Sequence, residues 1–507
     1  MSGKLVLGSD EQESYTAASI RHHISNRIRF ILVSAFILLL GVNLITFRSH
    51  IPSPQAVLDT LHIHNTKSTI QVALLNAHHA NDEVHTSLYN ALSHVPNLNI
   101  TRYQTVSSFG MDELVAELPH PPSTHWQTIE DFTQLTTHGT PPDILVSTTC
   151  GNDYSLETDA VSALKLDYAR LLEHHNTHLI CVMHQSQHFV DGFGFELKSI
   201  LKPWIEAGRV DLVTLSPHVG QYFMHDVWSL FWNDVRVAPV MRDFVPVFPV
   251  ELASSADDEQ EDLLKLAIQG SFDHGRDYQT IFSRFAEVKA EWKAQDQGED
   301  AAKVQLHIIG SGERPEVPSS IASQVVFHEN LDYGEYYRLL HTMDVMLPAI
   351  SQENWAGNDY YRNIASSSIA ASIIAGVPLV ADFKLMKAYS YLKLEMVWYK
   401  DDAEHEMDAA FRMLKATATK RAALRRAVVE RRVELMEENY ANVEQWVVEA
   451  QELAQARLVA AGDIIEVETV DVEGEAGPVE EAAVHRFNPF PGRPWNGSGR
   501  KRRGWIF

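Results

Sequence analysis

Residues 325–350 read VVFHENLDYGEYYRLLHTMDVMLPAI, with a short apolar run near each end. These runs, at 325–327 and 344–347, predict two β-strands. The same rhythm continues on both sides, where LLKLAI (263–268) precedes Gly270, VQLHII (304–309) precedes Gly310, and an apolar helical segment (364–375) returns to PLVA (378–381). Short β-rich runs that alternate with helices predict a parallel sheet covered on both faces. We therefore expect one α/β domain at 263–400.

A second series of the same kind lies upstream. Four apolar runs precede loops and helical segments: IQVALL (70–75), DILVS (143–147), LICVM (179–183) and VDLVTL (210–215). They predict a further Rossmann-like domain at 68–240, joined to the first by a linker at 241–262 that holds prolines and the acidic cluster DDEQED. Doubly wound sheets bind ligands at the carboxyl ends of their strands. With two such domains, the expected site is the cleft between them.

Charge and cysteine content exclude some classes of function. The chain has 507 residues and a formal net charge of −25, which disfavours nucleic acid as a partner. Its two cysteines, Cys150 and Cys181, are too few for a disulfide scaffold or a cysteine zinc site. We expect both to be small buried residues, and a single disulfide between them remains open.

The N-terminal region predicts a membrane anchor. Residues 30–47 read FILVSAFILLLGVNLITF, which is uncharged and long enough to cross a bilayer. Three arginines closely precede the run and only Arg48 closely follows it, so the positive-inside rule places residues 1–29 in the cytosol. A cleaved signal peptide would usually have a shorter apolar core. We therefore expect a single-pass type II protein of the Golgi or ER membrane, with a stem at 48–67 and the rest lumenal.

Other features outside the two domains agree with this topology. Two triplets, starting at Asn99 and Asn496, match the N-glycosylation pattern. Residues 401–461 are rich in helix-forming residues and predict C-terminal helices that pack on the core. Residues 462–507 are first acidic and then basic, a composition that predicts a disordered tail.

Candidate phosphate-binding groups follow the strands of the C-terminal domain. GSFDHGRDY (270–278) comes directly after a strand, and Gly310-Ser311-Gly312 repeats the arrangement. Glycine lets a backbone approach a ligand closely, and Arg276 can pair with a diphosphate. Ser366, Ser367 and Ser368 stand near a helix start, where hydroxyls and amides suit phosphate or ribose. The structural alternatives are strands that simply end in glycine and one serine that caps the helix.

At this point residues 263–400 resemble the nucleotide-sugar domain of the GT-B-fold glycosyltransferases, in the group 1 or glycogen-synthase-like superfamily. The resemblance rests on Gly270 with Arg276, on LHIIGSGE (306–313), on 325–350 and on the helix with Gly376-Val377-Pro378. It implies two domains that face a cleft. It also implies donor binding, with Tyr333 near the base, by residues Gly270, Ser271, Arg276, Gly310, Gly312, Tyr333, Ser366, Ser367 and Ser368.

The chain departs from the family at its acidic pair. Retaining members carry two glutamates eight positions apart before the Gly-x-Pro turn, where this chain has Asn363 and Ala371. Glu353 could substitute only if the loop is longer, and Ser271 stands at the family's phosphate-binding arginine. No Asp-x-Asp triplet ends an apolar strand, so we expect no metal and no cofactor besides a UDP- or GDP-linked donor.

An inverting reaction needs a base on the N-terminal domain. His79 and His184 each follow a predicted strand there, and Asp153 is a weaker candidate. The leading hypothesis is a hexosyltransferase that moves a sugar from a nucleotide diphosphate to a lumenal glycan, protein or lipid. The alternative is a catalytically inactive GT-B-like protein that binds a glycan or a partner glycosyltransferase.

Overall fold

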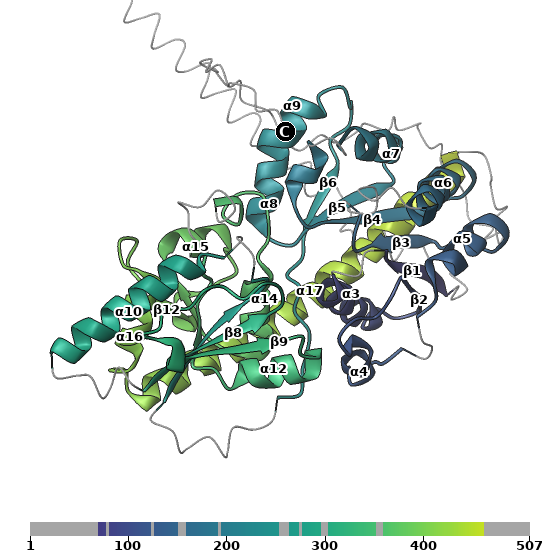
Figure 1. Cartoon of the computed structure of the whole chain (residues 1–507). Helices are drawn as coiled ribbons and strands as arrows, with labels where there is room; N and C mark the ends of the chain where they lie inside the picture. The colour runs from purple at the N-terminus through teal and green to yellow at the C-terminus, as the bar shows by residue number, and fades with distance from the viewer. Residues whose placement is uncertain are drawn as a thin grey trace, which may run out of the picture. The chain divides into compact units, whose positions relative to one another are not determined.

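The computed structural model describes nine stretches of the chain, namely residues 69–77, 81–122, 126–150, 159–190, 194–252, 263–272, 276–295, 303–350 and 358–460. Within them the strands form two six-stranded parallel sheets (Figure 1). The predicted α/β class with two parallel sheets is confirmed. The predicted span at 30–47 lies outside the described stretches, as do residues 1–29, the stem and the tail. In the part that is described, no helix is both long and apolar enough to cross a bilayer.

The N-terminal sheet has the order β2-β1-β3-β4-β5-β6. Its four central strands are short and almost wholly buried, as expected for a sheet covered on both faces, whereas the two edge strands are more polar and partly exposed. They are β1 (Ile70–Asn76), β2 (Leu98–Gln104), β3 (Ile144–Ser147), β4 (His178–Met183), β5 (Val210–Thr214) and β6 (Val240–Asp243). The order starts 2-1-3, so β1 and β3 are neighbours although β2 lies between them in sequence. Their carboxyl ends mark the topological switch point of this sheet.

Helices follow the first five strands of the N-terminal sheet. A capping box of Thr128 and Asp131 begins α5, which satisfies backbone N–H groups that the first turn leaves unpaired. The helices are α3 (Asp82–Ser93), α4 (Met111–Ala116), α5 (Ile129–His138), α6 (Asp159–His174), α7 (Gly194–Glu206), α8 (Pro217–Tyr222) and α9 (Ser229–Phe231). A 3-10 turn, η1 (Ser186–Phe189), and a π-helical segment, η2 (Phe223–Trp228), complete this part.

The C-terminal sheet has the order β12-β11-β10-β7-β8-β9. Numbered from β7, this is the Rossmann order 3-2-1-4-5-6, with its switch point between β7 and β10. The strands are β7 (Leu264–Gln269), β8 (Val304–Gly310), β9 (Val325–Glu329), β10 (Val345–Met346), β11 (Leu379–Ala381) and β12 (Val397–Tyr399). The helices are α10 (Tyr278–Ala294), α12 (Tyr333–His341), α14 (Ser367–Ala375), α15 (Phe383–Ala388) and α16 (Glu406–Met413), with 3-10 turns η4 (Ala322–Gln324) and η5 (Leu394–Met396).

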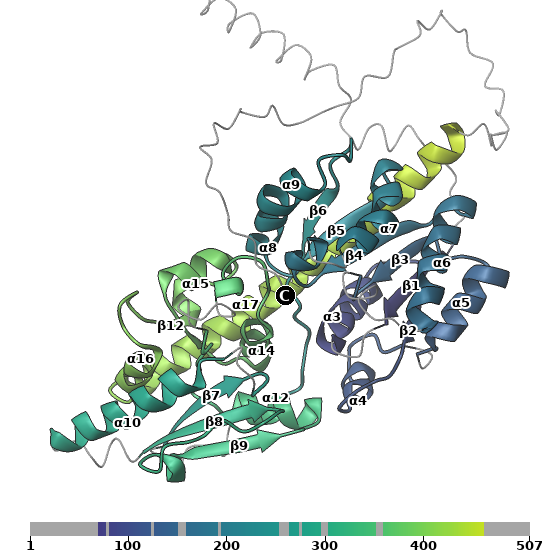
Figure 2. The ribbon, with the colours of Figure 1, turned by 45° about the horizontal axis from the view of Figure 1, so that its top comes forward.

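One long helix, α17 (Ala418–Ala460), runs beside both sheets (Figures 1 and 2). Asn439 Nδ2 donates to the carbonyl of Val245 (2.7 Å), and Arg431 Nε donates to the carbonyl of Tyr391 (3.0 Å). The same buried apolar cluster contains side chains of β1, β10 and α17. Both sheets therefore pack with α17 around a shared apolar core. The compact unit that contains the two sheets ends at Gln455, within this helix.

The predicted linker at 241–262 begins inside a strand, because residues 241–243 belong to β6. Pro239 precedes that strand, which is an edge of the sheet, so no ladder hydrogen bond is lost there. The next residues are core rather than linker, since Phe244 and Phe248 are buried and Phe248 packs edge-on to Tyr337. Residues 253–262, which hold the acidic cluster, lie outside the described stretches.

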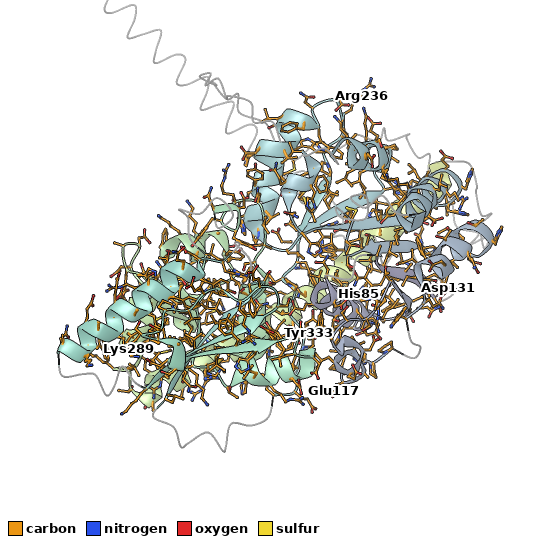
Figure 3. All side chains as sticks on the ribbon, in the orientation of Figure 1. His85, Glu117, Asp131, Arg236, Lys289 and Tyr333 are labelled. Atoms are coloured by element: carbon orange, nitrogen blue, oxygen red, sulfur yellow. A yellow bond between two sulfur atoms is a disulfide. The ribbon has the colours of Figure 1, made fainter. Side chains whose placement is uncertain are left out.

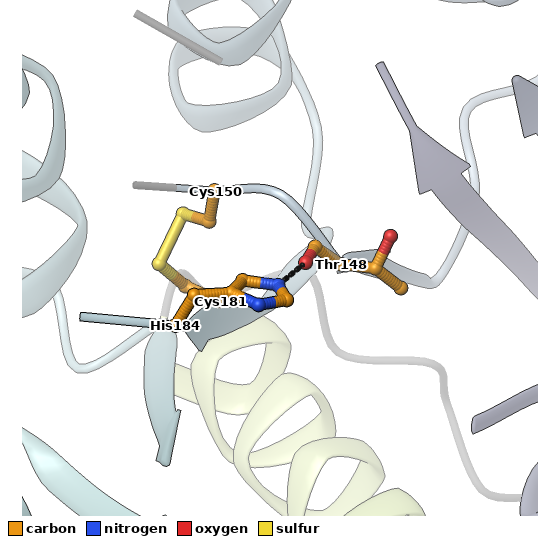
Figure 4. Close-up of a disulfide and its surroundings, with 4 residues drawn as sticks. All are labelled: Thr148, Cys150, Cys181 and His184. Carbon is orange, nitrogen blue, oxygen red and sulfur yellow. Dashed lines mark hydrogen bonds between the residues drawn. A yellow bond between two sulfur atoms is a disulfide. The ribbon is translucent and has the colours of Figure 1, made fainter. Parts of the chain in front are cut away.

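The two cysteines form a disulfide, which corrects the expectation of separate small buried residues (Figure 4). Cys150 directly follows β3 and Cys181 lies in β4, its neighbour in the sheet, so their Cα atoms are 5.3 Å apart. That separation is within the range a disulfide can bridge. The bond ties the chain after β3 to the middle of β4.

Two glycines of the predicted ligand turns are required by packing. A Cβ at Gly310 would lie 1.8 Å from the carbonyl oxygen of Gly270, so the turns after β7 and β8 touch through bare backbone. Gly270 has a φ of +133°, a conformation that other residues rarely adopt. The close approach predicted for a ligand is therefore made here by another part of the protein.

We expect Gly310→Ala to lower the free energy of unfolding by about 3 kcal/mol, because the added methyl overlaps backbone that cannot rotate away. Urea denaturation of the full chain measures the change. Gly334→Ala is the matched control, since Gly334 lies in the first turn of α12 and the nearest atom to its Cβ is in a movable aspartate side chain. An equal and small effect of both variants would contradict the packing role of Gly310.

Candidate functional site

Arg276 lies at the switch point of the C-terminal sheet. Its Nη1 donates to the carbonyl of Pro348 after β10 (3.0 Å), and its Nη2 donates to Ser368 Oγ (2.7 Å). Ser368 Oγ in turn donates to the carbonyl of Gln269 at the end of β7 (3.0 Å). Arg276 is 7% exposed and makes no ion pair with another described residue, although its charge influences the buried carboxyl of Glu406. A buried guanidinium held mainly by neutral groups is suited to bind an anion.

The start of α14 lies next to Arg276. Ser366 occupies the N-cap position, but its side chain makes no capping hydrogen bond. The residue is 3% exposed, and its Oγ has no hydrogen-bond partner among the described residues. Its backbone N–H donates to the hydroxyl of Tyr389 (2.9 Å). Ser366 therefore does not cap α14 through its side chain, which was the structural alternative. Its hydroxyl is available to a ligand.

A cavity of about 370 Å³ opens at this helix start and is walled by both halves of the protein. Ser366 and Ser367 line it from the C-terminal half. Asn81 and Glu83 from α3, with His184 after β4, line it from the N-terminal half. The carboxyl-end loops of two parallel sheets thus meet around one space, as the sequence predicts for the site.

Short contacts between the two halves border this cavity. The backbones of Gln185 and Ile364 form an antiparallel bridge, and Ser186 N–H donates to the carbonyl of Asn363 (2.9 Å). His218 lies with Nε2 3.2 Å from the carbonyl of Ile364. These contacts join loops of the two halves next to the cavity.

Glu83 is a site residue that sequence reasoning missed. It is the second residue of α3, lines the cavity and accepts a hydrogen bond from the hydroxyl of Tyr337 on α12. Burial raises the pKa of the Glu83 carboxyl to about 7, against a lowering effect of the Tyr337 hydrogen bond. Burial likewise raises the pKa of the neighbouring Asp82 to about 6. A carboxyl that titrates near neutrality in a cavity is a candidate acid or base.

Of the two predicted bases, His184 lies at the cavity and His79 lies outside the described stretches. His184 lines the cavity, and its Nε2 lies 2.6 Å from the carbonyl of Thr148 (Figure 4). Since a carbonyl only accepts, Nε2 carries the hydrogen in this contact. His79 and Asp153 lie outside the described stretches.

Of the other predicted donor-binding residues, some line a cavity and others make contacts within the fold. Gly312 lines a second cavity of about 860 Å³, together with Arg276 and Arg314, at the carboxyl ends of β7 and β8. The carbonyl of Ser271 accepts from the hydroxyl of Tyr278 (3.1 Å), so its described hydrogen bond is internal to the turn.

Tyr333, which the resemblance places near the base, contacts the N-terminal half of the protein. Its backbone N–H donates to the carbonyl of Phe109 in the N-terminal half (2.7 Å), and it lines none of the cavities described above. Figure 3 labels it at the start of α12. The turn before α12 brings this tyrosine against α4 because Asp332 Oδ1 caps the helix there.

The positions of the family's acidic pair hold no acid. Asn363 is buried, and its Oδ1 has no hydrogen-bond partner in the described part of the chain. Ala371 is buried within α14, and residue 353 lies outside the described stretches. Among the described residues, no group of three or more potential metal ligands gathers.

No family model and no curated protein sequence matches the chain. Among solved structures, HepE from Anabaena in complex with UDP and glucose is similar over 76% of this chain and 99% of its own, at 9% identity and a TM-score of 0.49. Sucrose-phosphate synthase from Thermosynechococcus elongatus matches over 78% and 100%, at 13% identity and 0.44. AviGT4, a glycosyltransferase involved in avilamycin A biosynthesis, matches over 74% and 98%, at 14% and 0.41. The sheet orders of the chain itself, not these likenesses, establish its two Rossmann-like sheets.

Proposed function

We propose that this protein is a metal-independent glycosyltransferase of GT-B type, which moves a hexose from a nucleotide diphosphate to a hydroxyl acceptor. The observation that carries the proposal is the start of α14. There the buried hydroxyl of Ser366, which has no hydrogen-bond partner among the described residues, faces a cavity between two Rossmann-like sheets. A helix N-terminus with an unused hydroxyl donor is suited to hold a phosphate.

In this proposal the N-terminus of α14 also stabilises the leaving diphosphate. The backbone N–H groups of Ser367 and Ser368 lie in the first turn of α14, where a helix leaves them without an intrahelical acceptor. In this proposal they stabilise the negative charge that develops on the leaving diphosphate. Arg276 adds a full positive charge directly behind Ser368. Together they supply the electrostatic stabilisation that metal ions supply in other transferases. The nucleoside then lies toward the larger cavity beside Gly312.

We further propose that the chain is a type II membrane protein with its folded part in the lumen of the secretory pathway. The disulfide between Cys150 and Cys181 favours an oxidising compartment. Asn99 is exposed on the edge strand β2, where a glycosylating enzyme can reach it. The acceptor in this proposal is a lumenal glycan, protein or lipid.

The second candidate is a binding protein that has lost catalysis. The replacement of the family's acidic pair by Asn363 and Ala371 favours it. This second candidate binds a glycan or a partner glycosyltransferase, and only the enzyme releases the nucleotide from a sugar donor. Release of UDP or GDP from the corresponding sugar donor therefore separates them.

We expect UDP or GDP to raise the unfolding temperature of the full-length chain in detergent, and Ser366→Ala to weaken that binding about 10-fold. A hydrogen bond to a charged group contributes about 1.5–3 kcal/mol. Ser372→Ala is the matched control, because Ser372 lies on the same helix and donates to the carbonyl of Ile369 (2.8 Å) within it. If neither nucleotide stabilises the wild-type chain, the proposed function fails.

A further inference from the structure

Glu83 and Tyr337 meet across the two halves of the protein. Glu83 belongs to α3, after the first strand of the N-terminal sheet, and Tyr337 belongs to α12 of the C-terminal half. They are 254 residues apart in sequence, and the tyrosine hydroxyl donates to the Glu83 carboxylate. Tyr337 is fully buried, whereas Glu83 still lines the cavity with Ser366. The Glu83 carboxylate therefore lines the cavity and also contacts the C-terminal half of the protein.

Burial raises the pKa of the Glu83 carboxyl to about 7, and the titratable groups around it adjust that value. On its own helix it is followed by His85 and preceded by Asp82, whose negative charge raises the pKa of Glu83 after burial. Tyr333, Tyr336 and Tyr337 face it from α12, and all three stay protonated at neutral pH because burial raises their pKa values. The other titratable side chains among the described residues that line this cavity are His184, Tyr360 and Tyr391.

We propose that Glu83 accepts the proton of the acceptor hydroxyl, and that Tyr337 positions this carboxylate only when the two halves are closed. The inference rests on the proposed glycosyltransferase function. Closure of the cleft then assembles the base as well as the donor site, so an open enzyme holding a sugar donor lacks an aligned base. This arrangement protects the donor from water until the acceptor is enclosed.

The step is a single displacement. The acceptor oxygen forms a bond to the anomeric carbon as its proton passes to the Glu83 carboxylate. The bond from the anomeric carbon to the diphosphate oxygen breaks, and its electron pair leaves with the nucleoside diphosphate at the start of α14. The configuration at the anomeric carbon inverts, in agreement with the absence of acids at Asn363 and Ala371.

The wall around Glu83 also selects the acceptor by charge. Among the described residues that line this cavity there is no lysine or arginine, and its polar lining includes the amides of Asn81 and Gln185 and the hydroxyls of Ser366 and Ser367. Asn81 Nδ2 is buried and has no hydrogen-bond partner in the described stretches. The geometry favours a neutral, hydroxyl-bearing acceptor such as an unphosphorylated sugar, since a phosphorylated one would find no cation on this wall.

The first test replaces Glu83 with Gln in the full-length chain, which keeps an acceptor for the Tyr337 hydroxyl but cannot take up a proton. The probes are UDP-glucose, UDP-N-acetylglucosamine and GDP-mannose with neutral methyl glycosides, and the readout is release of the nucleoside diphosphate. We expect kcat to fall about 100-fold or more, within the range for loss of a general base. UDP or GDP affinity is expected to be unchanged. Glu130→Gln, an exposed change on α5, is the control.

The second test replaces Tyr337 with Phe and measures kcat against pH. In the wild type, activity rises as the Glu83 carboxyl loses its proton, at about pH 7. The Tyr337 hydrogen bond lowers that pKa, so its loss moves the rising limb of the profile to higher pH. A residue that only fills the core would lower stability and leave the limb in place, so the shift identifies a positioning role.

The outcomes separate the two proposals. A wild-type chain that binds neither UDP nor GDP contradicts the proposed function itself. A chain that binds nucleotide but releases it from none of these donors is a binding protein, and the assignment of Glu83 is overturned. If release occurs but Glu83→Gln retains the wild-type kcat, or the product keeps the donor's anomeric configuration, the proposed function stands and the role of Glu83 is wrong.

Discussion

A Ser367→Asp variant is expected to bind UDP or GDP about 100-fold more weakly than the wild-type chain and to unfold at the same or a higher temperature. Ser367 is exposed at the first position of α14 and lines the cavity. A carboxylate at the start of a helix stabilises the helix dipole, so the fold does not suffer. The same carboxylate repels a diphosphate at about 6 Å by roughly 3 kcal/mol at an effective dielectric constant near 20, which corresponds to about 100-fold in affinity.

Ser367→Asn is the matched control, because asparagine has the size of aspartate without its charge. We expect it to bind nucleotide within a few-fold of the wild type. Isothermal titration of both variants and urea denaturation measure affinity and stability separately. Equal affinity of the Asp and Asn variants would show that no phosphate lies at the start of α14.

Removal of the disulfide has the second large expected effect. The bond closes a loop with a sequence separation of 31, and cross-linking a loop of that length stabilises a protein by about 3–4 kcal/mol. We expect the Cys150→Ala/Cys181→Ala variant to lose roughly that amount in urea denaturation. Dithiothreitol is expected to lower the midpoint of the wild type and to leave the variant unchanged.

The effect should extend to the site, because the carbonyl of Thr148 that contacts His184 lies two residues before Cys150. We therefore expect nucleotide affinity to be more sensitive to denaturant in the double variant. A wild-type midpoint that does not respond to the reductant would contradict the stabilising role of the disulfide.

Local sequence patterns predict the elements of this fold but not the order of its strands. Runs such as LICVM and VQLHII are short and apolar, which is enough to identify buried parallel strands. The pairing of β7 with β10 joins residues about 80 positions apart, and nothing in either strand specifies its neighbour. Most other neighbours in the two sheets, among them β3 and β4, are consecutive in sequence, as consecutive strands often are. That rule brings Cys150 and Cys181 together and could have predicted their bond.

The candidate site was predicted in part for the same reason. Ser366 and Ser367 belong to one short segment, and a helix start after polar residues is a local signal. Glu83 was missed because its raised pKa and its contact with Tyr337 arise only when distant parts of the chain enclose it. Its position just after β1 was the available signal, since ligands meet the carboxyl ends of parallel strands. Gly310 shows the reverse case, in which a glycine typical of ligand turns is needed for backbone packing.

The most direct test of the central claim is a crystal structure of the protein with UDP or GDP bound. We predict that the diphosphate lies within hydrogen-bond distance of Ser366 Oγ and of the first backbone N–H groups of α14, with the nucleoside toward Gly312. A diphosphate bound elsewhere, with Ser366 Oγ still without a partner, would contradict the claim.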